Sequence, residues 1–186
     1  ESASHVITVC QALADEIKGL GYRPKNITAL RNGVDLDMFL PPRDRDALRA
    51  KLNIKGFTLI SVGHHIERKG HHLVIDALQY LPDVDLLIAG DGPLESELKK
   101  QVADRGLNKR VRFLGSIHHA ELKDYYGASD ALILASSREG WANVLLESMA
   151  CGTPVVATAI WGTPEVVTCP EAGELVDRRV DSIVEA

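Results

Sequence analysis

The chain contains 186 residues, which is enough for one globular domain and part of another. Hydrophobic residues make up 45% of it and charged residues 25%, a composition typical of soluble globular proteins. The net charge of −5 argues against a general nucleic-acid or acidic-membrane binder, and no apolar run approaches the roughly 18–20 residues that span a bilayer.

The first part of the chain predicts a small group of elements followed by a connector. In chain order these are a strand over Val6–Cys10, an amphipathic helix over Gln11–Leu20, a strand over Ile27–Leu30, a turn at Asn32-Gly33, a connector over Phe39–Asp44 and a charged helix over Asp44–Leu52.

The remainder alternates between strands and helices. The strands are expected over Phe57–Val62, Val84–Ala89, Val111–Leu114, Ala131–Ala135, Pro154–Ala157 and Gly173–Val176, and the helices over Gly70–Leu81, Leu94–Arg105, Ala120–Ser129, Asn143–Cys151 and Pro164–Val167. Because these strands are near-continuous apolar runs, both faces of their sheet should be covered by helices. Repeated β-α units of this kind predict an α/β fold with a doubly wound, Rossmann-like parallel sheet.

The cysteines bear on the cellular compartment. Cys10, Cys151 and Cys169 are widely spaced and lie mostly in apolar contexts, and no secretory signal pattern precedes them. This pattern favours reduced, structural thiols over a disulfide framework, so we expect a cytoplasmic protein.

The loops that follow the strands are the expected place for chemistry, because a doubly wound sheet binds ligands outside the carboxyl ends of its strands. Each of these loops contains glycine, which lets the backbone approach a ligand closely. They span residues 63–70, 90–93, 115–119, 136–143 and 158–164.

Two carboxylates in this region stand out, Glu139 and Glu147. Glu147 lies in an almost wholly apolar predicted helix, so it needs hydrogen-bond donors, and the diol of a ribose would supply two. Glu139, in the loop before the same helix, would then hold hydroxyls of an attached sugar. The spacing alone leaves open an alternative, in which Glu147 is a solvated helix-terminal charge and Glu139 a solvated loop charge.

A diphosphate would fit between these two carboxylates. The free N–H groups at the start of the helix after Trp141 form a natural anion site. Lys69 follows the first strand of the main sheet by one short loop and reaches the same cleft as a point charge, with help from Arg68. A solvated lysine at a helix start is the alternative reading of Lys69.

Other ligand signals are weaker. Gly90-Asp91-Gly92 lacks the third glycine of a dinucleotide fingerprint, so we expect a tight turn there and not a dehydrogenase site. The pairs His64-His65 and His118-His119 lie on loops of one rim, but adjacent side chains point in different directions and no Asp, Glu or Cys ligand pattern accompanies them. We predict no metal ion and no cofactor.

Several segments of the chain together resemble the C-terminal, donor-binding half of a retaining glycosyltransferase of the GT-B fold, in the group 1 family. The resemblance covers nearly the whole chain, and its most specific part is the long last segment. The segments are 32–35 (Asn-Gly-Val-Asp), Val62-Gly63 with Lys69-Gly70, 90–93 (Gly-Asp-Gly-Pro) and 139–157, which holds the Glu-x7-Glu motif.

The resemblance implies a role for each matching position. Glu147 would bind the donor ribose and Glu139 the transferred sugar, Lys69 and the N–H groups of residues 141–144 the diphosphate, and the backbone around Ile117 the base. Glu139 and Lys69 are the implied catalytic residues. The implied donor-binding set is Gly63, His64, Lys69, Gly90, Ile117, Glu139, Gly140, Trp141, Ala142, Asn143, Val144 and Glu147.

This chain departs from the family pattern at two places. The family usually has arginine directly after the first-strand glycine, whereas this chain has His64, so a second cation on the diphosphate depends on that histidine. The family commonly has Phe-Gly after Glu-Gly, whereas Trp141-Ala142 stands here and would reshape the sugar pocket.

The resemblance also implies a domain organisation. Residues 1–31 would be the last strand and helix of an N-terminal domain with a link, and residues 32–186 a donor-binding domain. Because the chain begins without Met and stops within a short helical pattern, we expect a piece of a longer protein.

The implied activity belongs to that longer protein. It would transfer a hexose from a UDP- or GDP-sugar to a glycan or lipid-linked glycan, with retention of configuration and without a metal, in polysaccharide biosynthesis. The acceptor would be bound mainly by the N-terminal domain, peripheral association with the inner face of the membrane is compatible with this function, and the fragment alone should be inactive. Two alternatives remain open: a non-catalytic sugar-nucleotide sensor and a GT-B-like sugar-nucleotide epimerase.

Overall fold

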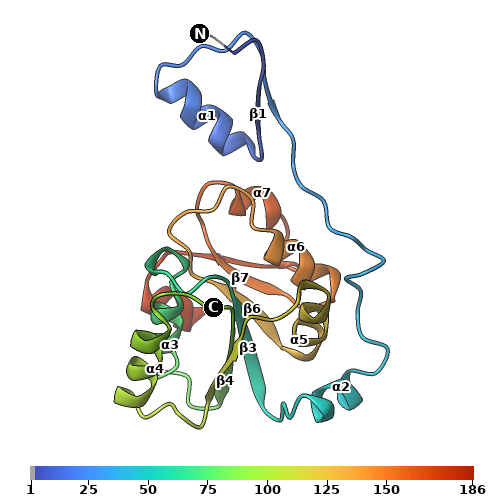
Figure 1. The fold of residues 1–186 in the computed structure, drawn as a ribbon, viewed down its shortest axis with the longest axis vertical. Coiled ribbons are helices and arrows are strands. Elements are labelled where there is room, and N and C mark those ends of the chain that lie inside the picture. Colours follow the sequence, from blue (N-terminus) through green and yellow to red (C-terminus); the bar gives the residue numbers. More distant parts are fainter. Residues whose placement is uncertain (1–2) are drawn as a thin grey trace.

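The structure, a computed structural model, describes residues 3–186 and has two parts, a large parallel sheet covered by helices and a small strand–helix–strand unit beyond one end of it (Figure 1). The large sheet has six strands in the order β5-β4-β3-β6-β7-β8, all paired in parallel. This arrangement confirms the predicted doubly wound α/β fold. The strands are β3 (Phe57–Val62), β4 (Val84–Ala89), β5 (Val111–Gly115), β6 (Ala131–Leu134), β7 (Val155–Thr158) and β8 (Gly173–Val176).

Helices cover both faces of this sheet. They are α2 (Arg45–Lys51), α3 (His71–Ala77), α4 (Glu95–Asp104), α5 (Leu122–Ala128), α6 (Asn143–Ala150), α7 (Thr163–Val166) and α8 (Val180–Glu185), with short 3-10 turns η1 (Glu67–Lys69) and η2 (His119–Glu121). None of the helices within residues 3–186 is long and apolar enough to cross a membrane.

Alternate side chains of each central strand enter opposite hydrophobic cores, as the two-residue period of a strand requires. Ile60 of β3 and Leu132 of β6 join one core with Leu145 of α6, whereas Leu59 and Ile133 join the other with α3 and α4. The central strands are therefore buried on both sides, which explains their near-continuous apolar sequences.

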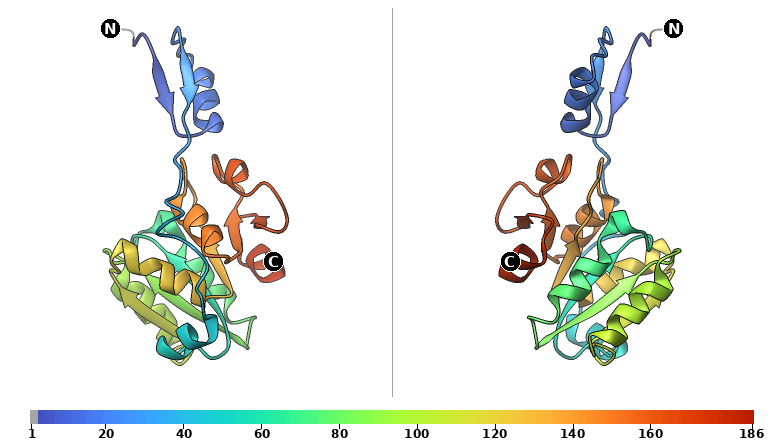
Figure 2. Two further views of the ribbon diagram at one scale, coloured as in Figure 1. Left: turned by 90° about the vertical axis from the view of Figure 1, so that its right-hand side faces the viewer. Right: turned by 90° about the vertical axis from the view of Figure 1, so that its left-hand side faces the viewer.

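The small unit consists of β1 (Val6–Thr8), α1 (Gln11–Gly19) and β2 (Ile27–Ala29), with β1 and β2 paired in parallel. An extended connector runs from β2 along the side of the molecule to α2 at the far end (Figures 1 and 2). Figure 2 shows the unit beyond the end of the large part at which α6 and α7 lie. Residues 1 and 2 of the predicted first segment, 1–31, lie outside the described residues.

The connector is anchored at its far end by Asp130, which follows α5. Its carboxylate accepts hydrogen bonds from Arg45 at 2.7 Å, from Arg49 at 3.1 Å and from the N–H of Thr58 at 2.7 Å. Burial alone would raise the pKa of Asp130, but these donors outweigh it and lower the pKa. The carboxylate thus ties α2 to the amino end of β3.

The largest differences from the predicted boundaries occur where a helix tightens into a 3-10 turn. Predicted helix 70–81 ends at Ala77, because Gln79 and Tyr80 donate to carbonyls three residues back, at Asp76 and Ala77, ahead of Pro82. Predicted helix 120–129 begins at Leu122, after η2. Lys69, predicted at a helix start, instead ends η1, and Gly70 follows it in a left-handed conformation.

Candidate functional site

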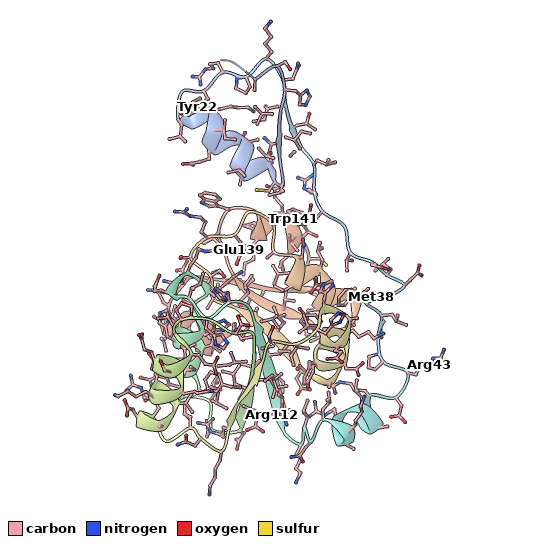
Figure 3. The ribbon with its side chains drawn as sticks, in the orientation of Figure 1. Tyr22, Met38, Arg43, Arg112, Glu139 and Trp141 are labelled. Carbon is pink, nitrogen blue, oxygen red and sulfur yellow. The ribbon has the colours of Figure 1, made fainter. Side chains whose placement is uncertain are left out.

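The candidate site lies where the direction of winding reverses. β3 and β6 are neighbours in the sheet, while β4 and β5 continue it on one side and β7 and β8 on the other. The loops that follow β3 and β6 leave the carboxyl ends of these two strands in different directions. Between them lies the crevice in which such sheets bind ligands. Glu139 and Trp141 lie at this end of the molecule, facing the small unit, and Arg112 lies at the opposite end (Figure 3).

These two loops are brought together by an ion pair. The ammonium of Lys69 lies 2.5 Å from Oε1 of Glu139, and the hydroxyl of Ser136 donates to the same oxygen at 2.8 Å. Glu139 is only 8% exposed. The sequence placed both residues in one cleft, and the structure shows them in direct contact.

Close backbone packing fixes the position of Lys69. A Cβ on Gly70 would lie 2.0 Å from the carbonyl oxygen of Ala135, at the end of β6, and one on Gly90 would lie 2.0 Å from the carbonyl oxygen of Gly63. The stem of Lys69 passes over Gly63, where an added Cβ would meet its Cδ at 3.3 Å. The loop after β3 can therefore lie on its neighbours only because glycines occupy these positions.

Glu147 lies on α6 and is 6% exposed. Its Oε2 accepts from the hydroxyl of Tyr126 at 2.9 Å, and its Oε1 lies 2.9 Å from Nε2 of His119. Burial, with the neighbouring carboxylate, raises the pKa of the Tyr126 hydroxyl far above its usual range and that of the Cys151 thiol to about 11. The predicted need of Glu147 for donors is confirmed, and the alternative of two solvated carboxylates is wrong, because both are buried.

The two partners of Glu147 differ in accessibility. Tyr126 is fully buried, whereas the side chain of His119 is 60% exposed and packs on Phe39 of the connector, with ring centres 5.1 Å apart. His119 can therefore move aside without opening the core, and this would free Oε1 of Glu147 for a ligand hydroxyl.

The start of α6 joins the site to the connector. The indole N–H of Trp141 donates to the carbonyl of Asn32 at 3.0 Å, and Asn32 also donates to Asn143 at 3.3 Å. Ala142 occupies the N-cap position, and no side chain within residues 3–186 caps the helix there. Its first N–H groups are thus available to an anion.

The remaining predicted residues lie on the rim. The side chain of His64 is 55% exposed, and its Nδ1 lies 3.3 Å from Asp91, so a carboxylate already faces it. Ile117 lies between β5 and η2, packed on the core that contains Leu145. Within residues 3–186 no group of three or more His, Cys, Asp or Glu side chains converges on a point suited to a metal ion. A separate hollow of about 270 Å³ lies among Thr58, Asp85 and Arg112, away from these residues.

Sequence reasoning missed three side chains that contact the two carboxylates, namely Ser136, Tyr126 and His119. Ser136 is three residues before Glu139, so a local hydrogen bond could have been anticipated from spacing. Tyr126 and His119 are 21 and 28 residues from Glu147, and the fold alone brings them to it.

Comparison with known protein families and sequences gave consistent matches. A family model described as "Glycosyl transferases group 1" matches residues 44–186. A lipopolysaccharide core biosynthesis glycosyltransferase of Rhizobium meliloti is 39% identical over 131 residues, covering 69% of this chain and 38% of that protein. A D-inositol 3-phosphate glycosyltransferase of Mycobacterium sp. (strain KMS) is 35% identical over 186 residues, covering 95% of this chain and 42% of that protein. The chain thus spans about two fifths of the length of these relatives.

Two solved structures share the fold across nearly the whole chain. Sucrose-phosphate synthase from Thermosynechococcus elongatus superposes with a TM-score of 0.89 at 29% identity, covering 100% of this chain and 48% of that one. HepE from Anabaena, solved in complex with UDP and glucose, superposes with a TM-score of 0.90 at 28% identity, covering 98% of this chain and 52% of that one.

Proposed function

The chain belongs to the group 1 glycosyltransferase family and has the fold of the C-terminal half of a GT-B enzyme, and from this premise we propose that it is the donor-binding half of a hexosyltransferase. The donor would be a nucleoside-diphosphate hexose, and the product would retain the anomeric configuration. HepE is solved with UDP and glucose, which makes UDP-glucose the first donor to test.

The observation that carries this proposal is the pair of buried carboxylates at the winding reversal, one of them paired to a lysine. Glu139 and Lys69 lie 2.5 Å apart at the ends of neighbouring strands, and Glu147 lies one helix turn inside α6. Burying a carboxylate is unfavourable unless partners compensate it, and a cluster of such buried, partnered charges beside an uncapped helix start is typical of a functional site.

Each part of a nucleotide sugar would meet a complementary group. The ribose hydroxyls would replace His119 on Glu147, and the diphosphate would lie against the start of α6 and the ammonium of Lys69. Glu139 would accept hydrogen bonds from the sugar. We propose that the diphosphate is held in this way without a metal ion or cofactor.

These groups would also act in the transfer step. The bond from the anomeric carbon to the diphosphate oxygen would break and a bond to an acceptor hydroxyl oxygen would form. Negative charge would build up on the departing nucleoside diphosphate, which would take up the proton of that hydroxyl. Lys69 and the N–H groups of α6 are fixed in advance where that charge develops, which is the condition for electrostatic stabilisation of a leaving group.

The acceptor would be bound elsewhere. A two-stranded sheet such as β1–β2 is marginally stable alone. We propose that residues 1–31 end a second domain that binds the acceptor, a glycan or lipid-linked glycan, and that residues 32–186 are the donor domain. The protein would then act at the inner face of a membrane in polysaccharide synthesis.

Nucleotide binding tests the donor site. We expect titration calorimetry with UDP, GDP and ADP to identify a nucleotide that the chain binds, and Glu147→Ala to weaken its binding by about 1–3 kcal/mol, because charge-assisted hydrogen bonds to the ribose are lost. Tyr126→Phe is the matched control: it removes the buried donor to Oε2 but keeps the carboxylate, so it should bind almost as well as the parent. The absence of binding at millimolar nucleotide would contradict the proposal.

A transfer assay tests whether this chain alone can transfer the sugar. We expect the 186-residue chain, incubated with UDP-glucose or GDP-mannose and a mixed glycan acceptor, to release nucleoside diphosphate no faster than a protein-free control, because under this proposal a second domain binds the acceptor. Nuclear magnetic resonance of the sugar detects any epimer in the same sample. Sugar transfer by this chain would place the catalytic groups within it, and epimer formation would favour the epimerase alternative.

A further inference from the structure

Glu165 of α7 joins two segments that are remote from it in the sequence. Its Oε2 accepts from the N–H of Gln11 at 3.1 Å and its Oε1 from the N–H of Ala12 at 2.9 Å, both in the first turn of α1. Arg31, just after β2, donates to Oε2 from Nε at 3.1 Å and from Nη2 at 2.5 Å. One carboxylate of the large part thus holds both the helix and the exit strand of the small unit.

This contact completes the N-terminus of α1. The N-cap of the helix is Cys10, whose thiol sulfur accepts from Leu13 at 3.4 Å and is a weak acceptor. Glu165 accepts from the first two N–H groups of the helix, those of Gln11 and Ala12, and places a negative charge where the helix dipole favours one. Burial alone would raise the pKa of Glu165, but the N–H groups of Ala12 and Gln11 and the Arg31 guanidinium outweigh it and lower the pKa. Glu165 is therefore ionised at neutral pH.

Close backbone packing near Glu165 also joins the small unit to the loop that holds Glu139, residues 136–143. A Cβ on Gly162 would lie 2.0 Å from the carbonyl oxygen of Gly140 and 3.1 Å from Cβ of Cys10, and one on Gly140 would lie 3.0 Å from Val9. The loops before α1, after Glu139 and before α7 thus meet with no room for a side chain. In Figure 3 the labelled Glu139 and Trp141 lie on the side of the large part that faces the small unit.

Arg31 adds a second link to that loop. Its guanidinium lies over the ring of Trp141, 5.8 Å from the ring centre, while it pairs with Glu165. Arg31 therefore connects the carboxylate that holds α1 to the aromatic residue at the start of α6.

We propose that Glu165 is a positioning residue that fixes the β1–α1–β2 unit against the loop from Ser136 to Asn143, so that the placement of that unit and the shape of the sugar end of the donor site are coupled. The docking follows from the contacts alone, and its effect on the donor rests on the proposed function. When the β1–α1–β2 unit is docked on Glu165, it would hold Gly140 and Trp141 in place around the sugar. When the unit is released, these two residues would be less well ordered.

Amide hydrogen exchange on the intact 186-residue chain tests the docking. In Glu165→Gln, which keeps the side-chain shape but loses the charge, the amides of Gln11 and Ala12 should exchange roughly tenfold faster or more. The amide offers one neutral acceptor oxygen where the carboxylate offers two charged ones, so one hydrogen bond is lost and the other is weakened. The amides of residues 136–143 should also exchange faster, while those of β3 and β4 should not change. The matched control, Glu171→Gln, changes an exposed glutamate in the loop before β8 and should match the parent.

Several outcomes would overturn the proposal. Unchanged exchange at Gln11 and Ala12 would remove the capping role, and faster exchange there with no change in residues 136–143 would remove the coupling. Equal acceleration in Glu171→Gln would show that the effect does not belong to Glu165. A second variant, Arg31→Gln, keeps the helix cap and loses the link to Trp141, so it should accelerate exchange in residues 136–143 more than at Gln11.

A binding comparison separates this proposal from the proposed function. In Glu165→Gln, UDP-glucose should lose roughly threefold to tenfold in affinity and UDP clearly less, because the sugar would lie along the loosened loop, whereas the diphosphate would meet only its last residues and Lys69. An equal loss for both ligands would contradict a role at the sugar end. If the parent binds neither ligand, the proposed function fails, and the exchange at Gln11 and Ala12 still decides the docking.

Discussion

Replacing Gly70 with alanine should destabilise the chain by about 3 kcal/mol or more, a large effect for the addition of one methyl group. Gly70 has a φ of +73°, which costs an L-residue about 1 kcal/mol, and an added Cβ would lie 2.0 Å from the carbonyl oxygen of Ala135. That oxygen belongs to the backbone at the end of β6 and cannot swing away as a side chain would. Either the loop after β3 or the end of β6 must move.

Gly106 provides a matched control for the backbone conformation. Its φ is +69°, almost the same as that of Gly70, but no atom of the described residues lies within 4 Å of the position of an added Cβ. Gly106→Ala should therefore cost only the conformational term, about 1 kcal/mol. Urea unfolding of the two variants and the parent measures both values. Equal destabilisation would contradict the packing argument and leave only backbone conformation.

The Gly70→Ala variant also tests the candidate donor site. Since Gly70 directly follows Lys69, a displaced loop would move the ammonium away from Glu139. Any Gly70→Ala protein that remains folded should bind nucleoside diphosphate more weakly than Gly106→Ala does.

The strands could be predicted well from the sequence, because strands buried in the two cores have continuous apolar sequences. β3, β4 and β8 begin and end at the predicted residues, because each is an apolar or alternating run bounded by turn residues. Helix ends were predicted less well, since the 3-10 turns η1 and η2 depend on single hydrogen bonds such as that from Glu121 to His118. Such a bond leaves no periodic signal in the sequence.

The site could be predicted only in part. The burial of Glu147 follows from the apolar helix around it, and the sharing of one cleft by Lys69 and Glu139 follows from the order of strands and loops. The partners of Glu147 and the contact between Glu165 and α1 could not be predicted, because they join segments 21 to 154 residues apart. Such contacts depend on the packing of the whole fold.

The ion pair between Lys69 and Glu139 leads to the second large effect. Lys69→Met keeps most of the stem but leaves Glu139, 8% exposed, with a hydrogen bond from Ser136 and no cation. Removing one partner of a buried pair costs about 3–5 kcal/mol, and the residual exposure of both side chains lowers our expectation here to about 2–4 kcal/mol. Glu139→Gln should cost less, because the amide oxygen still accepts from Lys69. Urea unfolding of both variants tests this order.

The two variants should change nucleotide affinity in opposite directions. If Lys69 binds the diphosphate, Lys69→Met should weaken UDP binding by roughly tenfold to a hundredfold, as the loss of a charge-assisted hydrogen bond predicts. Glu139→Gln should instead tighten UDP binding by several-fold, because it removes a negative charge 2.5 Å from the ammonium that meets the phosphates. Titration calorimetry with UDP at constant ionic strength measures both changes.

Comparing the affinity for UDP-glucose with that for UDP then separates contacts to the sugar from contacts to the phosphates. If Glu139 accepts hydrogen bonds from the sugar, Glu139→Gln should bind UDP more tightly than the parent does but gain little or nothing for UDP-glucose, because the lost sugar contact offsets the removed charge. A gain of equal size for both ligands would show that Glu139 contacts no sugar. Weaker UDP binding in both variants would show that the intact pair, and not the free ammonium, forms the phosphate site. In that case Glu139 would position Lys69, and the contact to the sugar would have to come from another residue of the loop.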